Sequence, residues 1–111
     1  MKKWRRWTQN GIAMRVRWLR TASRNLDVAI EYIAREDPDA AAKVYAQIRE
    51  SVAALAEQPS MGRPGRIFGT RELVIGKYPY IVPYRIQDNE VQILRIFHTS
   101  RKPPKTWQAP D

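Results

Sequence analysis

Residues 36–55, EDPDAAAKVYAQIRESVAAL, decide the fold of this 111-residue chain. Asp37 can cap a helix whose first residue is Pro38, because a proline at that position costs no hydrogen bond. Apolar residues then recur at helical spacings, and they are Ala41, Val44, Tyr45, Ile48, Val52 and Leu55. The stretch therefore predicts an amphipathic helix that ends before Pro59 and needs another surface to cover its apolar stripe.

The preceding residues predict a partner for this helix. They carry a second apolar stripe about four turns long, made of Ala22, Leu26, Ala29, Ile30 and Ile33. The break at residues 36–38 is short, so we expect the two helices to form an antiparallel hairpin. Before them, residues 15–19 (RVRWL) alternate basic and apolar side chains, which is typical of a half-buried strand.

Downstream of Pro59 the sequence becomes strand-like. Residues 60–69 hold three glycines and a proline and predict a loop. Strands are expected at residues 72–75, 80–85 and 91–97, with a hairpin around Asp88 and Asn89. Pro83 interrupts the middle run, so either its missing N–H faces outward or a bulge lies there. The predicted fold class is α+β: an N-terminal strand, an antiparallel two-helix hairpin, and a three-strand antiparallel meander, forming one sheet with the helices on one face.

The length and composition predict one domain, covering residues 14–111. Residues 1–13 contain four basic residues and no acidic one, and we expect them to form a disordered arm; a phosphate-binding tail and an upstream translation start are the alternatives. There is no cysteine, which excludes disulfides and thiolate chemistry and fits a cytoplasmic location. No stretch approaches the ~20 apolar residues of a membrane span, so no membrane partner is expected.

Charge indicates the class of partner. Twenty Lys and Arg residues against eleven Asp and Glu residues give a net charge of +9. Such a surplus on a small domain favours a polyanionic partner, either nucleic acid or an acidic protein, although a merely soluble basic protein has the same composition. The meander and its flanks hold much of this charge. The residues predicted to bind nucleic acid or another target are Arg71, Lys77, Tyr80, Arg85, Arg95, Lys102 and Lys105.

His98 is the only histidine, and histidine is the residue type whose side chain can change its charge near neutral pH. If RNA were cut here, His98 would act as acid or base, Arg101 would stabilise the phosphate charge, and Tyr84 or Tyr80 would relay a proton. The alternative is that His98 simply ends a strand. The sequence contains no metal-binding cluster or phosphate-binding loop, so neither a metal nor a cofactor is expected.

Five stretches in series resemble the RelE/ParE superfamily of toxins from type II toxin–antitoxin modules. They are DPDAAAKVYAQI (37–48), EQPSMGRPGR (57–66), GTRELVI (69–75), YPYIVPYRI (78–86) and VQILRIFHTSRKPP (91–104). The resemblance covers roughly residues 15–107. It implies a helix hairpin on a twisted antiparallel sheet, and an antitoxin that wraps and neutralises the toxin. We expect the antitoxin's binding segment to be acidic and amphipathic.

The superfamily is divided in activity. RelE-like members cut mRNA on the ribosome with basic residues on the sheet and an Arg and a Tyr near the C-terminus, whereas ParE-like members inhibit DNA gyrase without cutting nucleic acid. Arg101 matches the late catalytic arginine. The other matching positions carry Glu72 and Val74 in place of two lysines, Ile81 in place of an arginine, and Trp107 in place of the tyrosine.

The resemblance therefore favours a ParE-like toxin, with the growth inhibition and plasmid stabilisation that this branch implies. A RelE-like, ribosome-dependent and metal-independent endoribonuclease that uses His98 and Arg101 is the first alternative. The second alternative is a non-toxic module that binds nucleic acid or a partner through its basic sheet.

Overall fold

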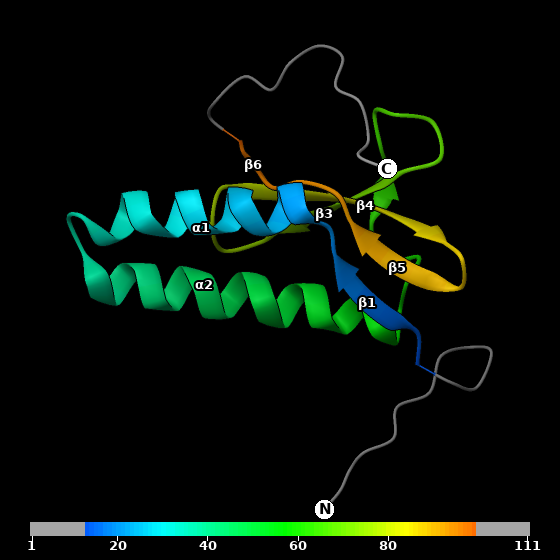
Figure 1. Ribbon diagram of the computed structural model, residues 1–111, viewed down its shortest axis with the longest axis horizontal. Coiled ribbons are helices and arrows are strands. Elements are labelled where there is room, and N and C mark those ends of the chain that lie inside the picture. The colour runs from blue at the N-terminus through cyan, green and yellow to red at the C-terminus, as the bar shows by residue number, and fades with distance from the viewer. Residues whose placement is uncertain (1–12, 100–111) are drawn as a thin grey trace, which may run out of the picture.

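A computed structural model describes residues 13–99 of the chain. Within this range the structure contains strand β1 (Arg15–Trp18), helices α1 (Arg20–Ala34) and α2 (Pro38–Ala53), the 3₁₀ turn η1 (Ala54–Ala56), and strands β2 (Arg63–Pro64), β3 (Arg71–Ile75), β4 (Tyr80–Gln87), β5 (Glu90–Ile93) and β6 (Phe97–His98). The two helices run antiparallel beside each other, as the hairpin prediction requires (Figure 1). The expected basic arm, apart from Ala13, and residues 100–111 lie outside the described residues.

Helix α2 begins as its sequence predicts. The Asp37 side chain accepts a hydrogen bond from the Ala40 N–H at 3.1 Å, and Pro38 occupies the first turn. Most of the predicted apolar stripe is buried, with Val44, Ile48 and Leu55 at most 5% exposed. Tyr45 is the exception, since 42% of it is exposed and its ring lies 5.8 Å from the guanidinium carbon of Arg49. The prediction that Tyr45 belongs to the buried stripe was wrong.

The strands form one mixed sheet in the order β1-β5-β4-β3-β2. Strands β3, β4 and β5 make the expected antiparallel meander, and β1 adds to its edge by pairing parallel to β5. The β4–β5 hairpin turns at Asp88 and Asn89, which have φ values of 54° and 63°. Positive φ at both central residues defines the type I′ turn that suits the twist of a two-residue hairpin.

The hydrophobic core lies between the helix hairpin and one face of the sheet. Alternate residues along the strands face the helices, and the buried ones are Leu73, Ile75, Tyr80, Val82, Tyr84, Val91 and Ile93. The opposite face, here called the open face, carries a smaller cluster of Leu19 and Leu94 with Ile67 and Phe97. Among the described residues, 13–99, no helix is both long and apolar enough to cross a membrane.

The last predicted strand, residues 91–97, is interrupted in the structure. Strand β5 ends at Ile93, and β6 resumes pairing with β4 one residue out of step: Ile93 opposes Tyr84, whereas Phe97 opposes Ile81. The chain thus bulges between Ile93 and Phe97, opposite Pro83. The Pro83 carbonyl accepts a hydrogen bond from the Leu94 N–H at 2.9 Å, but Pro83 has no N–H with which to donate the reciprocal hydrogen bond of the ladder. A bulge is one of the two outcomes that the sequence predicted for this proline.

Helix α1 holds the bulge in place. The side-chain oxygen of Asn25 accepts a hydrogen bond from the Ile96 N–H at 3.0 Å, which satisfies a backbone donor that has left the ladder. Beyond β6, the Thr99 N–H donates to the Pro79 carbonyl at 2.7 Å. The strand end that carries His98 is therefore fixed both to α1 and to the start of β4.

Replacing Asn25 with alanine tests this anchor. Asn25→Ala leaves the Ile96 N–H without its acceptor, so we expect a loss of about 1–3 kcal/mol in the free energy of unfolding. The amide of Ile96 should also exchange with solvent faster in native-state hydrogen exchange. Asn25→Asp keeps an acceptor oxygen and serves as the control. Equal exchange rates at Ile96 in Asn25→Ala and the unchanged protein would contradict the assignment.

Candidate partner-binding groove

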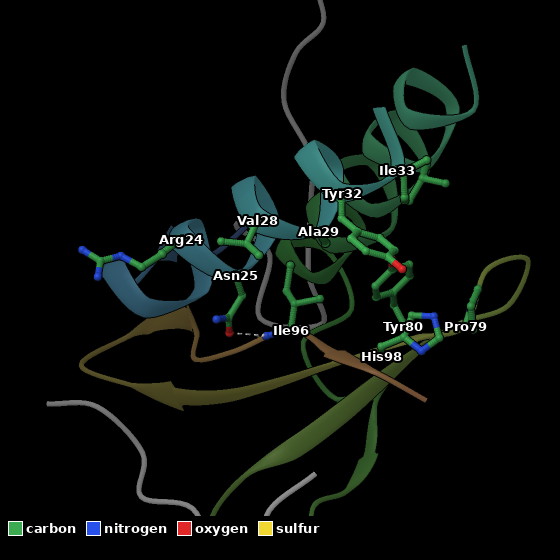
Figure 2. A pocket seen from close by; sticks show the side chains of 11 residues that line it. Arg24, Asn25, Val28, Ala29, Tyr32, Ile33, Pro79, Tyr80, Ile96 and His98 are labelled. Atoms are coloured by element: carbon green, nitrogen blue, oxygen red, sulfur yellow. Dashed lines mark hydrogen bonds between the residues drawn. The ribbon is translucent and has the colours of Figure 1, made fainter. Parts of the chain in front are cut away.

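A groove of about 500 Å³ lies between α1 and the strand ends of β4 and β6. Helix α1 forms one wall, and the residues around the bulge and the start of β4 form the other (Figure 2). The lining residues are Arg24, Asn25, Val28, Ala29, Tyr32, Ile33, Val44, Pro79, Tyr80, Ile96 and His98. The groove is thus mainly apolar, with polar groups at its ends.

The helix wall exposes large apolar side chains. Val28 is 58% exposed and Tyr32 is 61% exposed, although both lie beside the buried stripe of α1. They are one turn apart and face the same side of the helix. Arg24 lies one turn before Val28 and marks one end of the groove, whereas His98 lies at the other end (Figure 2). Such a surface suits a ligand with apolar side chains and at least one carboxylate.

His98 packs against Tyr80 at the strand end. The two residues are paired across β4 and β6, and their ring centroids are 5.1 Å apart at an interplanar angle of 83°. This edge-to-face contact is a favoured geometry for aromatic rings, and it fixes the positions of both rings in the wall of the groove. Tyr80 is only 6% exposed, while His98 is half-buried. The structure thus brings His98 and Tyr80 together, and it does so because the bulge shifts the register by one residue.

Tyr84 has a structural position. It is fully buried, its hydroxyl donates to the Pro59 carbonyl at 2.7 Å, and it accepts from the Gly62 N–H at 2.8 Å. Burial raises the pKa of this hydroxyl, against the opposing effects of the Gly62 hydrogen bond and the Arg71 charge. A Cβ at Gly62 would lie 2.7 Å from the Tyr84 ring, so only glycine fits there. We therefore leave Tyr84 out of the candidate site.

Arg71 belongs to the same structural unit. Its guanidinium donates to the carbonyl oxygens of Ser60 and Gly62, at 3.2 and 2.7 Å. These bonds fasten the loop after η1 to the start of β3. Lys77 lies exposed in the turn between β3 and β4, and Arg95 is half-buried within the bulge. Among residues 13–99, the predicted basic residues Arg71, Lys77 and Arg95 therefore lie in three different parts of the structure.

Arg85 lies on the open face in a polar chain that crosses three strands. Its Nε donates to Gln92 at 2.7 Å, Gln92 donates to Glu90 at 2.8 Å, and Arg17 donates to Glu90 at 2.8 Å. Hydrogen bonds from Arg17 and Gln92 lower the pKa of Glu90, against a smaller effect of desolvation. The guanidinium of Arg85 keeps further N–H donors for a ligand, but its position is set by this chain.

Three of the predicted residues, Arg101, Lys102 and Lys105, lie outside the described residues, as does Trp107. Between residues 13 and 99 no group of three or more histidine, aspartate and glutamate side chains could hold a metal ion. The helix wall of the groove was not predicted from the sequence. Val28 and Tyr32 offered a signal, because both are large, four residues apart and outside the apolar stripe of α1.

Comparisons with known proteins agree with this architecture. Residues 16–103 match the family described as the ParE toxin of the type II toxin–antitoxin system parDE. The Y4kP protein of Sinorhizobium fredii is 52% identical over 91 residues, which cover 82% of this chain and 94% of that protein. Toxin RelE2 of Caulobacter vibrioides is 33% identical over 84 residues, covering 76% of this chain and 93% of that protein.

Two solved toxin–antitoxin assemblies contain chains of similar structure. A chain of the chromosomal ParDE system from P. aeruginosa superimposes with a TM-score of 0.72 and 31% identity, covering 78% of this chain and 96% of that chain. A chain of the RelBE2 toxin–antitoxin complex from Mycobacterium tuberculosis gives a TM-score of 0.58 and 28% identity, covering 78% and 99%. The similarity spans the helix hairpin and the sheet, and it reaches both named branches of the superfamily.

Proposed function

The chain belongs to the ParE toxin family of type II toxin–antitoxin systems, and on that premise we propose that it arrests bacterial growth by binding an essential enzyme such as DNA gyrase. On this proposal the toxin acts by occupying its target, and it does not cut nucleic acid. The basic surplus of +9 would favour association with an acidic surface on that target.

The residue types on the open face of the sheet are the main support for this proposal. The resemblance places the sheet lysines and arginine of RelE-like nucleases at Glu72, Val74 and Ile81, and these residues share the open face because they alternate with the core residues of β3 and β4. Glu72 is buried to 3% exposure beside Arg63 and Arg66. A carboxylate and two aliphatic side chains cannot stabilise the charge that develops on a phosphate during RNA cleavage.

The RelE-like endoribonuclease stays as a second candidate because of one observation. The chain is 33% identical to RelE2 of Caulobacter vibrioides over most of both sequences. On this alternative, His98 would exchange a proton with the substrate and Arg101 would hold the phosphate. His98 is half-buried beside Tyr80, and it lines a groove that is large enough to admit a ligand.

We further propose that the groove along α1 receives the neutralising antitoxin. The similar solved structures are toxin–antitoxin systems, which supports an antitoxin partner. Val28, Tyr32 and Ile33 would receive the apolar side chains of an amphipathic segment, and Arg24 would face one of its carboxylates. An acidic segment also fits the net charge of +9 on this chain.

Induced expression in a bacterial host without the antitoxin tests the target. We expect growth arrest with lost DNA supercoiling and intact messages, because a ParE-like toxin blocks its target without cleaving RNA. Transcript ends and plasmid topology should be measured together in the same cultures. New cuts inside translated messages that disappear in His98→Ala would instead establish the RelE-like alternative. Soluble protein that causes no arrest would contradict both.

Charge substitutions at Val28 test the groove. Val28→Asp should weaken binding of the cognate antitoxin about 30-fold, the loss typical of a central interface residue, because it sets a negative charge against an acidic segment. Val28→Lys should weaken it much less. Affinity can be measured by titration calorimetry on the purified toxin variants.

Val74→Asp provides the matched control, because Val74 is 48% exposed but lies on β3 and away from the groove. It should bind the antitoxin as the unchanged toxin does. Equal losses in Val28→Asp and Val28→Lys would argue against an acidic partner, and no loss in either would place the antitoxin elsewhere.

A further inference from the structure

Phe68 is fully exposed in a loop that the proposed groove does not use. Its relative exposure is 103%, whereas the other exposed large hydrophobic side chains described range from 42% to 61%. Each of those side chains is therefore about 40% or more covered by the rest of the protein, whereas nothing covers the ring of Phe68. Single exposed apolar residues are common on proteins, so the argument depends on how this one is held.

The backbone holds Phe68 at the tip of a tight turn. The Thr70 N–H donates to the Ile67 carbonyl at 3.0 Å, which closes a four-residue β-turn with Phe68 and Gly69 at its centre. The backbone φ angle is 84° at Gly69 and negative at Phe68. A positive φ at the second central residue alone is the pattern of a type II turn. The Gly65 N–H also donates to the Thr70 carbonyl, at 2.8 Å. The loop is therefore bridged at its base and at its tip.

Two side chains that precede Phe68 fasten the turn to the sheet. Ile67 packs on the open-face cluster of Leu19 and Leu94. Arg66 donates to the Glu72 carboxylate through its backbone N–H and its Nε, both at 3.1 Å. Burial would raise the pKa of Glu72, but these bonds and the Arg66 and Arg63 side chains outweigh it and lower the pKa, so the carboxylate stays ionised at neutral pH. Ile67 before the turn is half-buried and Thr70 after it is buried, whereas Phe68 is fully exposed.

The groove and the Phe68 loop lie on different sides of the molecule. Tyr80 and Ile96 of the groove belong to the core between sheet and helices, whereas Ile67 of the loop packs on the open face. Figure 1 draws the loop that joins β2 to β3 at the end of the sheet away from the tip of the helix hairpin. One partner can therefore contact the groove while the loop stays accessible to another.

We propose that Phe68 is the anchor with which the toxin binds its protein target, inserting into an apolar pocket rimmed by carboxylates. The inference rests on the proposed function, since it assigns a contact residue for the target. A rigid aromatic side chain loses little conformational entropy on binding, which is why such residues dominate interface energetics. Arg63 and Arg66 flank it with side chains 55% and 38% exposed, and their outer N–H groups can meet acidic residues at the rim.

A nucleic acid fits this loop less well than a protein. Binding to a phosphate backbone needs cationic side chains that can reach and follow it. Here Arg63 and Arg66 share the Glu72 carboxylate at 3.3 and 3.1 Å, and Arg71 is bonded to the backbone at Ser60 and Gly62. Their positions are fixed by the fold, and one carboxylate offsets part of their charge. The apolar ring of Phe68 is then the main source of binding energy.

The test compares the expression level needed for half-maximal growth arrest in the absence of antitoxin. Phe68→Ala should require about 30-fold more toxin than the unchanged protein, the loss typical of a hot-spot residue. Phe68→Leu keeps an apolar side chain and should recover part of the activity. Ile86→Ala removes a 43% exposed apolar side chain from the β4–β5 hairpin and should behave as the unchanged toxin does. Toxin levels are measured by quantitative immunoblot.

Two further readouts separate this inference from the proposed function. Purified Phe68→Ala should keep its circular dichroism spectrum and its affinity for the antitoxin. p-Benzoyl-phenylalanine installed at position 68 should crosslink to DNA gyrase, the proposed target, in arrested cells. If Phe68→Ala arrests growth at the same expression level as the unchanged toxin, the inference is wrong but the proposed function is not. The same holds if Phe68→Ala loses its affinity for the antitoxin as well. Adducts with nucleic acid or with a second copy of the toxin also overturn it. If the unchanged toxin does not arrest growth, the proposed function fails first and the inference fails with it.

Discussion

The missing N–H of Pro83 is the constraint on which the groove depends. A residue without a donor at the centre of the sheet cannot complete the ladder with the next strand, and the chain opposite it bulges between Ile93 and Phe97. The bulge carries Ile96 to Asn25 on α1 and sets β6 against the start of β4. His98 then meets Tyr80 edge to face. An uninterrupted strand would leave residues 96–98 in a different register.

Local signals in the sequence were sufficient to predict most of the fold. The cap at Asp37, the two apolar stripes and the Asp88-Asn89 turn each act over a few residues, and the structure confirms all three apart from Tyr45 in the second stripe. The parallel pairing of β1 with β5 joins segments more than seventy residues apart, and no local pattern encodes it. The sequence indicated a bulge at Pro83 as one of two outcomes, but the end of β5 at Ile93 depends on the pairing itself.

The site was harder to predict because residue type does not fix the face on which a side chain lies. Tyr84 was a candidate relay, yet its period-two spacing from Tyr80 and Val82 already placed it on the core side. Arg71 and Arg85 are bonded to backbone and side-chain groups that only the fold brings near them. On our account the antitoxin and the target use different sides of the toxin.

Hydrogen–deuterium exchange of the toxin, alone and bound to its antitoxin, tests this division most directly. We expect binding to slow exchange of the amides in α1 from residue 24 to residue 33 and of residues 96–98, the two segments that carry most of the groove lining. The amides of residues 65–69 should exchange at the same rate in both states. Protection of residues 65–69 without any change along α1 would contradict the account, because the antitoxin would then cover the loop and leave the groove empty.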